Sequence, residues 1–365
     1  MDKQPTTKHI AFLINDITQL GGTERMCVLI CNELSRLGYK ITIISQTEAN
    51  KEPFFLLDRQ VTTERLFEKE PSLTNKLALP VVIGKKVKSI CADLYISCDT
   101  QMCLFSSIPL LGKKHIGWEH FNSQIVTTFG SRWFGRRLAS LLCDKIIVLT
   151  ESDKKHWVDK LNTNHAKLAV IPNPLPVPRA KQIDNSNRQN IVLAMGRMTE
   201  QKGFDLLIQA WSHIPEINRK NWILRIVGPN GSAKPALEMM ITKHHLEHCV
   251  QLIAESKQVE QEYQQAAIYV LSSRYEGFGL TLIEAMGQGL PVIAYDCPMG
   301  PAEIIANDYG RLVKSGDIQG LAESIEEFIA DSQLRQKYSD LAYQRSAIYS
   351  PDIIIRQWVS IIQQP

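Results

Sequence analysis

The sequence lacks the features of a membrane-spanning, secreted or disulfide-bonded protein. No apolar run approaches the roughly 18–20 residues that a helix needs to cross a bilayer. The first residues, MDKQPTTKHIAFLIN, contain no long apolar segment followed by a cleavage site. The eight cysteines form no CxxC pair, and several lie in segments that we predict to be helix or strand. These absences favour reduced thiols and predict a cytoplasmic protein.

The sequence also has no strong excess of charge of one sign. Its formal net charge is +3, which is too small to indicate a nucleic-acid partner, and we expect none. Hydrophobic residues make up 44% of the chain and charged residues 22%, as is typical of a soluble globular protein. With 365 residues, the chain is long enough for two domains that each bury a core.

The dinucleotide-binding pattern GxGxxG is also absent, although predicted strands, loops and helices alternate in both halves of the sequence. The first strand is expected over 9–15, a loop over 16–23 carries Gly21 and Gly22, and a helix and a second strand follow. Residues 50–80 show no clear pattern, and we predict them to be irregular. Further short strands are predicted over 93–98, 114–118, 145–149, 167–171, 190–195, 222–227, 250–254, 268–271 and 292–294. This alternation predicts α/β domains with parallel sheets.

The segment PLPVPRAKQIDNSNRQN is rich in proline, asparagine and charge and has no periodicity, so we place a linker between Pro174 and Gln189. We predict a first domain over 1–176, a second domain over 188–348 and a C-terminal helix over 349–365.

The stretch from Leu271 to Ile293, LSSRYEGFGLTLIEAMGQGLPVI, is the most informative part of the chain. A strand is predicted before it, and Leu280 to Met286 reads as a helix. A loop between a strand's carboxyl end and a helix N-terminus is where open α/β sheets bind ligands, and the free N–H groups there favour an anion. Glu276 and Glu284 can accept hydrogen bonds from hydroxyl groups. The stretch therefore predicts a site for a negatively charged, hydroxyl-rich ligand.

This stretch resembles the donor-binding motif of the family 4 retaining glycosyltransferases, in which two glutamates stand eight positions apart across a glycine-rich turn. The matching positions are Glu276, Gly277, Phe278, Gly279, Glu284, Ala285, Gly289, Pro291 and Val292. The resemblance implies that Glu284 holds the ribose hydroxyls and that Glu276 holds a hydroxyl of the transferring sugar. It also places Leu280 in the donor site and Ile253, on the strand over 250–254, beside the nucleobase.

Two cationic residues are expected to bind the diphosphate of the donor. Arg197 and Lys202 flank a loop after the strand over 190–195, where two cations can converge on one anion. Family 4 enzymes carry an arginine and a lysine at this spacing, bound to the donor's diphosphate. The resemblance therefore assigns Arg197 and Lys202 to donor binding and to catalysis.

The match in the first half is thinner. A Gly-Gly pair after the first strand faces the diphosphate in this family, and Gly21 and Gly22 fit it by position. A histidine of the first domain often lies near the transferring sugar, usually followed by Asp, whereas His120 is followed by Phe121. The resemblance gives His120 the role of orienting the sugar or the acceptor. A tight turn at the glycines and a structural histidine remain the alternatives.

The resemblance implies a GT-B fold, with two Rossmann-like domains facing across a cleft and a last helix that crosses back to the first domain, anchored by Trp358. Retention in this family is attributed to front-face attack, in which the leaving phosphate helps to deprotonate the acceptor. The sequence contains no Asp-x-Asp pair, the usual metal signature of the other large glycosyltransferase fold. We therefore expect no metal and no other cofactor, since cationic side chains can neutralise the diphosphate.

Two other features leave alternatives open. A basic and aromatic segment, together with three nearby lysines, could contact an anionic membrane surface, or could be an ordinary solvated helix face. These residues are Arg132, Trp133, Phe134, Arg136 and Arg137, with Lys85, Lys86 and Lys88. His244 and His248 are four apart on a predicted helix, but nothing nearby completes a metal site.

The resemblance favours a retaining glycosyltransferase that moves a hexose or N-acetylhexosamine, most simply from a UDP-sugar, to a glycan or lipid-linked acceptor. The Gly-Pro-x-Glu-Ile run at 300–304 resembles members that build bacterial surface polysaccharides and glycans. The protein would then be cytoplasmic, with a peripheral membrane position as an option. The alternatives are a sugar-nucleotide epimerase or phosphorylase on the same scaffold, and a non-catalytic sugar-nucleotide-binding protein.

Overall fold

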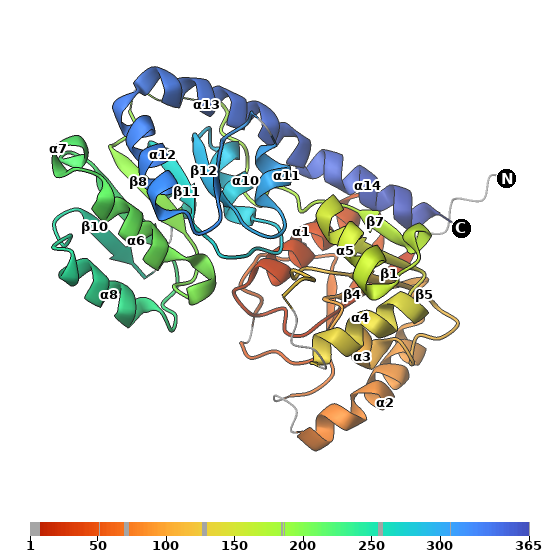
Figure 1. The fold of residues 1–365 in the computed structure, drawn as a ribbon. Helices are drawn as coiled ribbons and strands as arrows, with labels where there is room; N and C mark the ends of the chain where they lie inside the picture. The colour runs from red at the N-terminus through yellow and green to blue at the C-terminus, as the bar shows by residue number, and fades with distance from the viewer. Residues whose placement is uncertain are drawn as a thin grey trace. The chain divides into compact units, whose positions relative to one another are not determined.

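The computed structural model divides into two compact units (Figure 1). Unit 1 comprises Met1–Pro176 together with Pro351–Pro365, and unit 2 comprises Val177–Ser350. The structure describes residues 8–50, 52–68, 73–125, 130–183, 185, 187–254, 258–306 and 308–364. None of the helices in these ranges is both long enough and apolar enough to cross a membrane.

Unit 1 is built on a parallel sheet of seven strands in the order β3-β2-β1-β4-β5-β6-β7. Its elements are β1 (His9–Ile14), α1 (Gly22–Arg36), β2 (Lys40–Ser45), β3 (Thr62–Arg65), α2 (Leu73–Ile90), β4 (Leu94–Cys98), α3 (Cys103–Ser106), β5 (Lys114–Trp118), α4 (Ser131–Leu142), β6 (Lys145–Val148), α5 (Glu151–Leu161), a 3-10 turn (His165–Lys167), β7 (Leu168–Val170) and α14 (Pro351–Gln363). Every residue of β1 and β4 is buried, as expected for central strands with helices on both faces.

Unit 2 repeats this plan with a parallel sheet of six strands in the order β10-β9-β8-β11-β12-β13. Its elements are β8 (Ile191–Met195), a 3-10 turn (Glu200–Lys202), α6 (Phe204–His213), α7 (Glu216–Arg219), β9 (Ile223–Val227), α8 (Lys234–Lys243), β10 (Val250–Ile253), α9 (Val259–Gln265), β11 (Ile268–Leu271), α10 (Leu280–Gly287), β12 (Val292–Asp296), α11 (Pro301–Ile305), β13 (Arg311–Lys314), α12 (Ile318–Ala330), α13 (Ser332–Ser346) and a 3-10 turn (Ala347–Tyr349). Both units are Rossmann-like, which confirms the predicted fold class.

The last helix, α14, belongs to unit 1 although the chain reaches it through unit 2 (Figure 1). The Trp358 ring is buried and meets the ring of Trp118 on β5 edge to face, with centroids 4.7 Å apart. Lys8 Nζ donates a hydrogen bond to the carbonyl of Ile362 at 2.9 Å. The predicted return of the C-terminal helix to the first domain is confirmed, with Trp358 as its buried anchor.

Three sequence predictions about local structure are wrong. Residues 50–80 are not all irregular, because they contain β3 and the beginning of α2. All four residues of β3 are exposed, so the strand has no apolar pattern, and Pro80 lies inside α2. Helix α1 begins at Gly22, inside the predicted loop. Helix α8 ends at Lys243, and His245 has a φ of 53°, so His244 and His248 do not share a helix face.

Candidate functional site

The two loops that carry the predicted donor residues meet at the middle of the sheet in unit 2. Strands β8 and β11 are neighbours, and the strand order reverses direction between them, which is where open α/β sheets bind ligands. A Cβ at Gly203 would lie 2.0 Å from the carbonyl oxygen of Ser272, so only glycine allows this approach. The amide of Arg274 donates to the carbonyl of Gln201 at 2.8 Å. The two loops are therefore fastened together by their backbones.

Lys202 and Glu276 form an ion pair between these loops. Lys202 Nζ lies 2.7 Å from Glu276 Oε1, and Ser273 Oγ donates to the same oxygen at 2.6 Å. The Glu276 side chain is 8% exposed and that of Lys202 is 18% exposed, so the pair is largely shielded from solvent. The structure thus brings together a predicted phosphate-binding cation and a predicted sugar-binding carboxylate.

Gly279 shapes the beginning of α10. Its φ of 110° is in the region that favours glycine, and it precedes Leu280, the first residue of the helix. Phe278 is buried against Tyr349, with ring centroids 5.8 Å apart, while Gly277 is half-buried. The unpaired N–H groups at this helix N-terminus can donate to an anion.

Glu284 lies one turn further along α10 and is buried. Its Oε2 accepts a hydrogen bond from the hydroxyl of Tyr263, on α9, at 2.6 Å. Sequence reasoning missed Tyr263, because a tyrosine in a short polar helix gives no signal of which carboxylate it contacts. The phenol helps to fix the position of the carboxylate, whose oxygens are hydrogen-bond acceptors.

The remaining donor-site residues of unit 2 lie on neighbouring loops. Arg197 is exposed on the loop after β8. Among the described residues, it makes no contact with the Lys202–Glu276 pair. Ile253 ends β10, and its carbonyl accepts from the amide of Gly228 at 2.9 Å. Among the residues described, no group of three His, Cys, Asp or Glu ligands gathers in these loops.

The predicted site residues of the first half belong to unit 1. Gly21 caps the N-terminus of α1, and a Cβ there would lie 2.1 Å from a carboxylate oxygen of Glu24. The Glu24 carboxyl thus fills the space that the glycine leaves, beside the exposed Gly22. Burial raises the pKa of Glu24 to about 7, and the negative charges of Asp16 and Asp99 add to this shift.

His120 follows β5 and stacks on Trp118, with ring centroids 4.2 Å apart. Burial lowers the pKa of His120 to about 4, against the opposing charge of Glu119, so the imidazole is neutral at pH 7. Its Nε2 atom is buried without a hydrogen-bond partner among the described residues. An imidazole in this state can give or accept one hydrogen bond once a ligand reaches it.

Glu119 has a structural role in this loop. Its Oε2 accepts from Nε of Arg136 at 2.6 Å, and its Oε1 accepts from the amides of His120 and Phe121. Burial alone would raise the pKa of Glu119, but the charge of Arg136 and the hydrogen bonds from Arg136, Thr100 and the amide of Phe121 together lower it. Arg136 is fully buried, so the predicted basic surface does not include it. This correction follows from the buried Glu119 carboxylate, which needs a cation.

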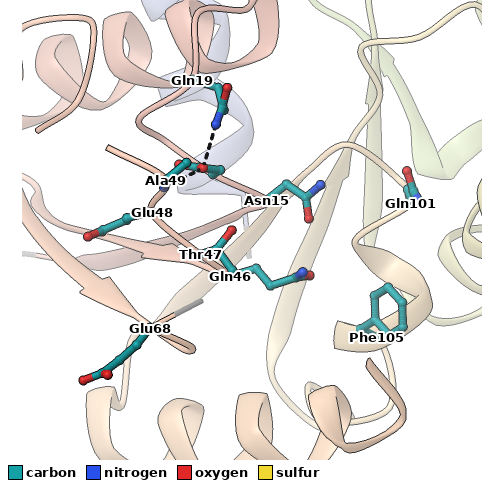
Figure 2. Close-up of a pocket in the computed structure, with 10 residues that line it drawn as sticks. Asn15, Gln19, Gln46, Thr47, Glu48, Ala49, Glu68, Gln101 and Phe105 are labelled. Carbon is teal, nitrogen blue, oxygen red and sulfur yellow. Dashed lines mark hydrogen bonds between the residues drawn. The ribbon is translucent and has the colours of Figure 1, made fainter. Parts of the chain in front are cut away.

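Unit 1 also has a polar pocket of about 530 Å³ at the carboxyl ends of β1 to β4 (Figure 2). Amide and carboxylate side chains dominate its wall, and the ring of Phe105 is its main aromatic surface. The lining residues are Asn15, Asp16, Gln19, Gln46, Thr47, Glu48, Ala49, Glu68, Gln101 and Phe105. Asp16 is held by the amides of Thr18 and Ala49, each at 2.9 Å. The described part of the wall offers many hydrogen-bonding groups and no lysine or arginine.

Two Rossmann-like units, one of which presents a lysine, two glutamates and a helix N-terminus at its switch point, fit the GT-B class that the sequence motif resembles. The protein family described as "Glycosyltransferase Family 4" matches residues 20–179, and the family described as "Glycosyl transferases group 1" matches residues 178–345. The chain belongs to the family 4 glycosyltransferases.

Similar proteins agree with this assignment. An uncharacterized glycosyltransferase of Haemophilus influenzae is 31% identical over 97% of this chain and 100% of its own length. The amylovoran biosynthesis glycosyltransferase AmsD of Erwinia amylovora is 30% identical over 97% of this chain and 99% of its own. Among solved structures, Anabaena HepE in complex with UDP and glucose has a TM-score of 0.81 and 18% identity, over 97% of this chain and 99% of that one.

Proposed function

We propose that this glycosyltransferase moves a hexose or N-acetylhexosamine, with retention of configuration, from a UDP-sugar to a glycan or lipid-linked acceptor. The process it serves would be the synthesis of a bacterial surface polysaccharide or glycan. The relative AmsD is named for amylovoran biosynthesis, and HepE was solved with UDP and glucose, which supports both choices. Catalysis would need no metal ion.

The observation that carries the proposal is the Lys202–Glu276 ion pair at the switch point of unit 2. In the ligand-free site each group neutralises the other at 2.7 Å. A diphosphate arriving at the N-terminus of α10 offers Lys202 a stronger anion, because its two phosphates together carry two negative charges and present more acceptor oxygens than one carboxylate. Glu276 then becomes available to accept a hydrogen bond from a sugar hydroxyl, so that donor binding exchanges one ion pair for two new contacts.

The same groups would serve the chemical step. Negative charge builds up on the diphosphate when its bond to the sugar breaks, and fixed donors lower the free energy of that state. Lys202 and the first amides of α10 are already held in place by the two fastened loops, and Arg197 supplies a second cation from the same loop as Lys202. The leaving phosphate would accept the acceptor's proton, so no protein nucleophile is required.

The pocket of unit 1 supports a saccharide as acceptor. Hydroxyl groups need partners that both donate and accept hydrogen bonds, and the amides of Asn15, Gln46 and Gln101 provide them. The ring of Phe105 offers an apolar face to the carbon side of a sugar (Figure 2). The neutral His120 would orient the reacting hydroxyl.

A thermal-shift screen with UDP-, GDP- and ADP-sugars, without added divalent ions, tests the donor. We expect a UDP-sugar to raise the Tm, and Lys202→Ala to abolish the shift and to lower turnover by on the order of 10²–10³. Lys220→Ala is the matched control, because Lys220 is an exposed lysine of the same unit outside these loops. Full turnover in Lys202→Ala would contradict the proposal.

Three further measurements test the finer points. Proton NMR of the product should show the anomeric configuration of the donor, and an inverted product would exclude retention. Turnover should be unchanged when Mg²⁺ or Mn²⁺ is added. Slow release of UDP from the donor without acceptor would distinguish an enzyme from a pure binding protein, which releases none.

A further inference from the structure

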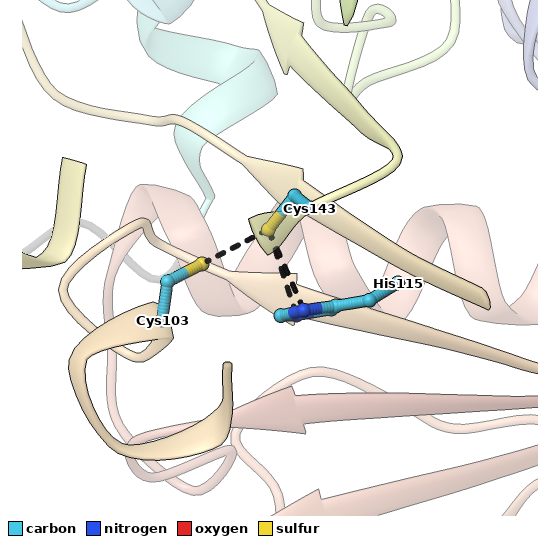
Figure 3. Close-up of side chains that lie close together, drawn as sticks. All are labelled: Cys103, His115 and Cys143. Carbon is cyan, nitrogen blue, oxygen red and sulfur yellow. Dashed lines mark hydrogen bonds between the residues drawn. The ribbon is translucent and has the colours of Figure 1, made fainter. Parts of the chain in front are cut away.

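Three buried side chains of unit 1 bring two thiols and an imidazole together (Figure 3). Cys103 begins α3, His115 lies on β5, and Cys143 directly follows α4. Their exposed fractions are 0%, 1% and 1%, so they lie in the core and outside the donor loops of unit 2. Two cysteines and a histidine form the ligand set that zinc and other thiophilic metals prefer.

The distances between these ligand atoms suit a bound ion. Two sulfurs on a tetrahedral zinc ion lie about 3.8 Å apart, and a sulfur and a nitrogen lie about 3.6 Å apart. Here Cys103 Sγ and Cys143 Sγ are 3.9 Å apart, and Cys143 Sγ is 3.4 Å from His115 Nδ1. One ligand atom from each of the three residues lies within 4.8 Å of the others, so the three residues are close enough to share one ion.

The imidazole lies between a serine hydroxyl and the Cys143 thiol. His115 Nε2 is 2.9 Å from Ser97 Oγ, which is in turn 2.9 Å from Ser106 Oγ. Cys143 Sγ is 3.4 Å from Nδ1 and 4.0 Å from Nε2, so it lies beside the ring rather than along the Nδ1 lone pair, and the imidazole must turn before Nδ1 can bind an ion. A hydroxyl partner for the second nitrogen, such as Ser97, is usual for a metal-bound histidine. The amide of His115 also donates to the carboxylate of Asp144 at 2.7 Å, which holds β5 beside the residue that follows Cys143.

Gly117 leaves space next to both sulfurs. A Cβ at this position on β5 would lie 3.4 Å from Cys103 Sγ, 3.6 Å from Cys143 Sγ and 3.7 Å from the Cβ of Ala139. These are ordinary contact distances, so a methyl-sized volume is open beside the thiols. A water molecule there could complete four-coordinate geometry.

We propose that Cys103, His115 and Cys143 bind one structural Zn²⁺ ion, or a thiophilic divalent ion of similar size, with a water beside Gly117 as fourth ligand. Binding converts both thiols to thiolates and releases their two protons, so the buried complex is electrically neutral. Because the ligands come from α3, β5 and the end of α4, the ion would fasten three segments that are distant in sequence. It would enter during folding, as is usual for buried structural sites.

The same unit contains a built-in comparison. Cys27, Cys31 and Cys98 are also buried, with Cys27 Sγ 4.0 Å from Cys31 Sγ and 3.7 Å from Cys98 Sγ. This group has no imidazole, and three thiolates around one divalent ion would leave a net negative charge in the core. We therefore expect it to remain metal-free.

The test is elemental analysis of the full chain purified without chelators, followed by unfolding, removal of metal and refolding with Co²⁺. We expect about one zinc per chain. In the cobalt form we expect a thiolate charge-transfer band and visible absorption bands with the intensity that is typical of tetrahedral cobalt. His115→Ala and Gly117→Ala should each reduce the metal to less than about a tenth per chain, whereas Cys31→Ser should keep it.

Wild-type protein that contains no metal above background and takes up no Co²⁺ on refolding would overturn the proposal, whatever the variants do. Metal that remains in His115→Ala but disappears in Cys31→Ser would assign the ion to the other thiol group and overturn it equally. Both measurements report the ion directly, so they stay informative if a cysteine variant folds poorly. They are also independent of sugar transfer.

Discussion

At the level of single residues, the position of Glu284 depends on a phenol from a neighbouring helix. Tyr263→Phe removes the hydrogen bond to Glu284 and leaves the ring in the core. Since hydrogen bonds to charged groups contribute about 1.5–3 kcal/mol, we expect the Kd for the donor to rise by about three- to tenfold, with part of the loss recovered by side-chain relaxation.

Calorimetric titration with UDP-sugar measures this change in Kd. Tyr338→Phe is the control, because the Tyr338 ring packs on Phe328 in the same unit at 5.2 Å between centroids. Equal Kd values for the two variants would show that Tyr263 does not position the carboxylate.

Glu24 gives a prediction about pH. Its pKa is raised to about 7 by burial, so the folded state holds the proton more tightly than the unfolded chain does. The resulting stabilisation is complete below the unfolded pKa near 4.5 and is lost as the pH rises through about 7. Glu24→Gln cannot ionise, and its free energy of unfolding should therefore exceed that of the wild type at about pH 8 by more than at about pH 5.

Urea unfolding of both proteins at the two pH values measures this difference. Glu33→Gln, on the same helix but ion-paired with Arg36, should not show the pattern. A difference between Glu24→Gln and wild type that stays constant with pH would mean that Glu24 is ionised throughout.

Single residues also show what sequence can reveal. Lys202, Glu276 and Glu284 could be proposed as site residues from the sequence, because they lie on or after loops that follow predicted parallel strands and they match the family motif. Their partners could not be found in this way. The pairing of Glu119 with Arg136 depends on side-chain packing across two segments, and Arg136 was therefore misread as a surface cation.

At the level of elements, the loop before α11 supports the donor loop by direct backbone contact. Gly300 has a φ of 101°, and a Cβ there would lie 1.8 Å from the carbonyl oxygen of Phe278. Gly300→Ala must displace the segment that leads into α10, so we expect it to lower the free energy of unfolding by more than about 3 kcal/mol and to weaken donor binding.

Gly316→Ala is the control that separates the steric clash of an added Cβ from the cost of a positive φ in a residue other than glycine. Gly316 has a φ of 79°, and a Cβ added there would meet nothing within 4 Å, so its substitution should cost only about 1–2 kcal/mol. Urea unfolding and UDP-sugar binding of both variants are the measurements. Similar losses in the two would refute steric support of the donor loop by Gly300.

Helices and strands that bury an apolar face could be predicted from the sequence. Elements without such a face could not be predicted. The ranges of β5 and β11 agree with the sequence prediction, because apolar runs mark them. Strand β3 is an exposed edge strand held by backbone pairing to β2, and a sequence pattern carries no sign of that pairing.

At the level of the whole molecule, α14 is held in unit 1 by a buried aromatic contact. Trp358→Ala leaves a cavity against Trp118, and we expect a loss of about 3–5 kcal/mol in the free energy of unfolding. Hydrogen exchange should show lower protection in β5 and unchanged protection in β11 of unit 2.

Ile353→Ala is the matched control, because Ile353 lies on the same helix with 39% of its side chain exposed, and its effect should stay within about 0.5 kcal/mol. Equal loss of protection in both sheets would show that the units do not unfold separately. The two-unit architecture itself was predictable, since each half repeats the same alternation of strands and helices.

The discontinuity of unit 1 has a consequence for synthesis on the ribosome. Translation delivers residues 1–176 first, yet their partner segment, Pro351–Gln363, emerges only after all of unit 2. Domains generally fold as the nascent chain emerges, so unit 2 can complete its sheet while unit 1 still lacks α14. Until then the apolar patch around Trp118 stays uncovered, and this interval is when a chaperone would be most useful to the growing polypeptide.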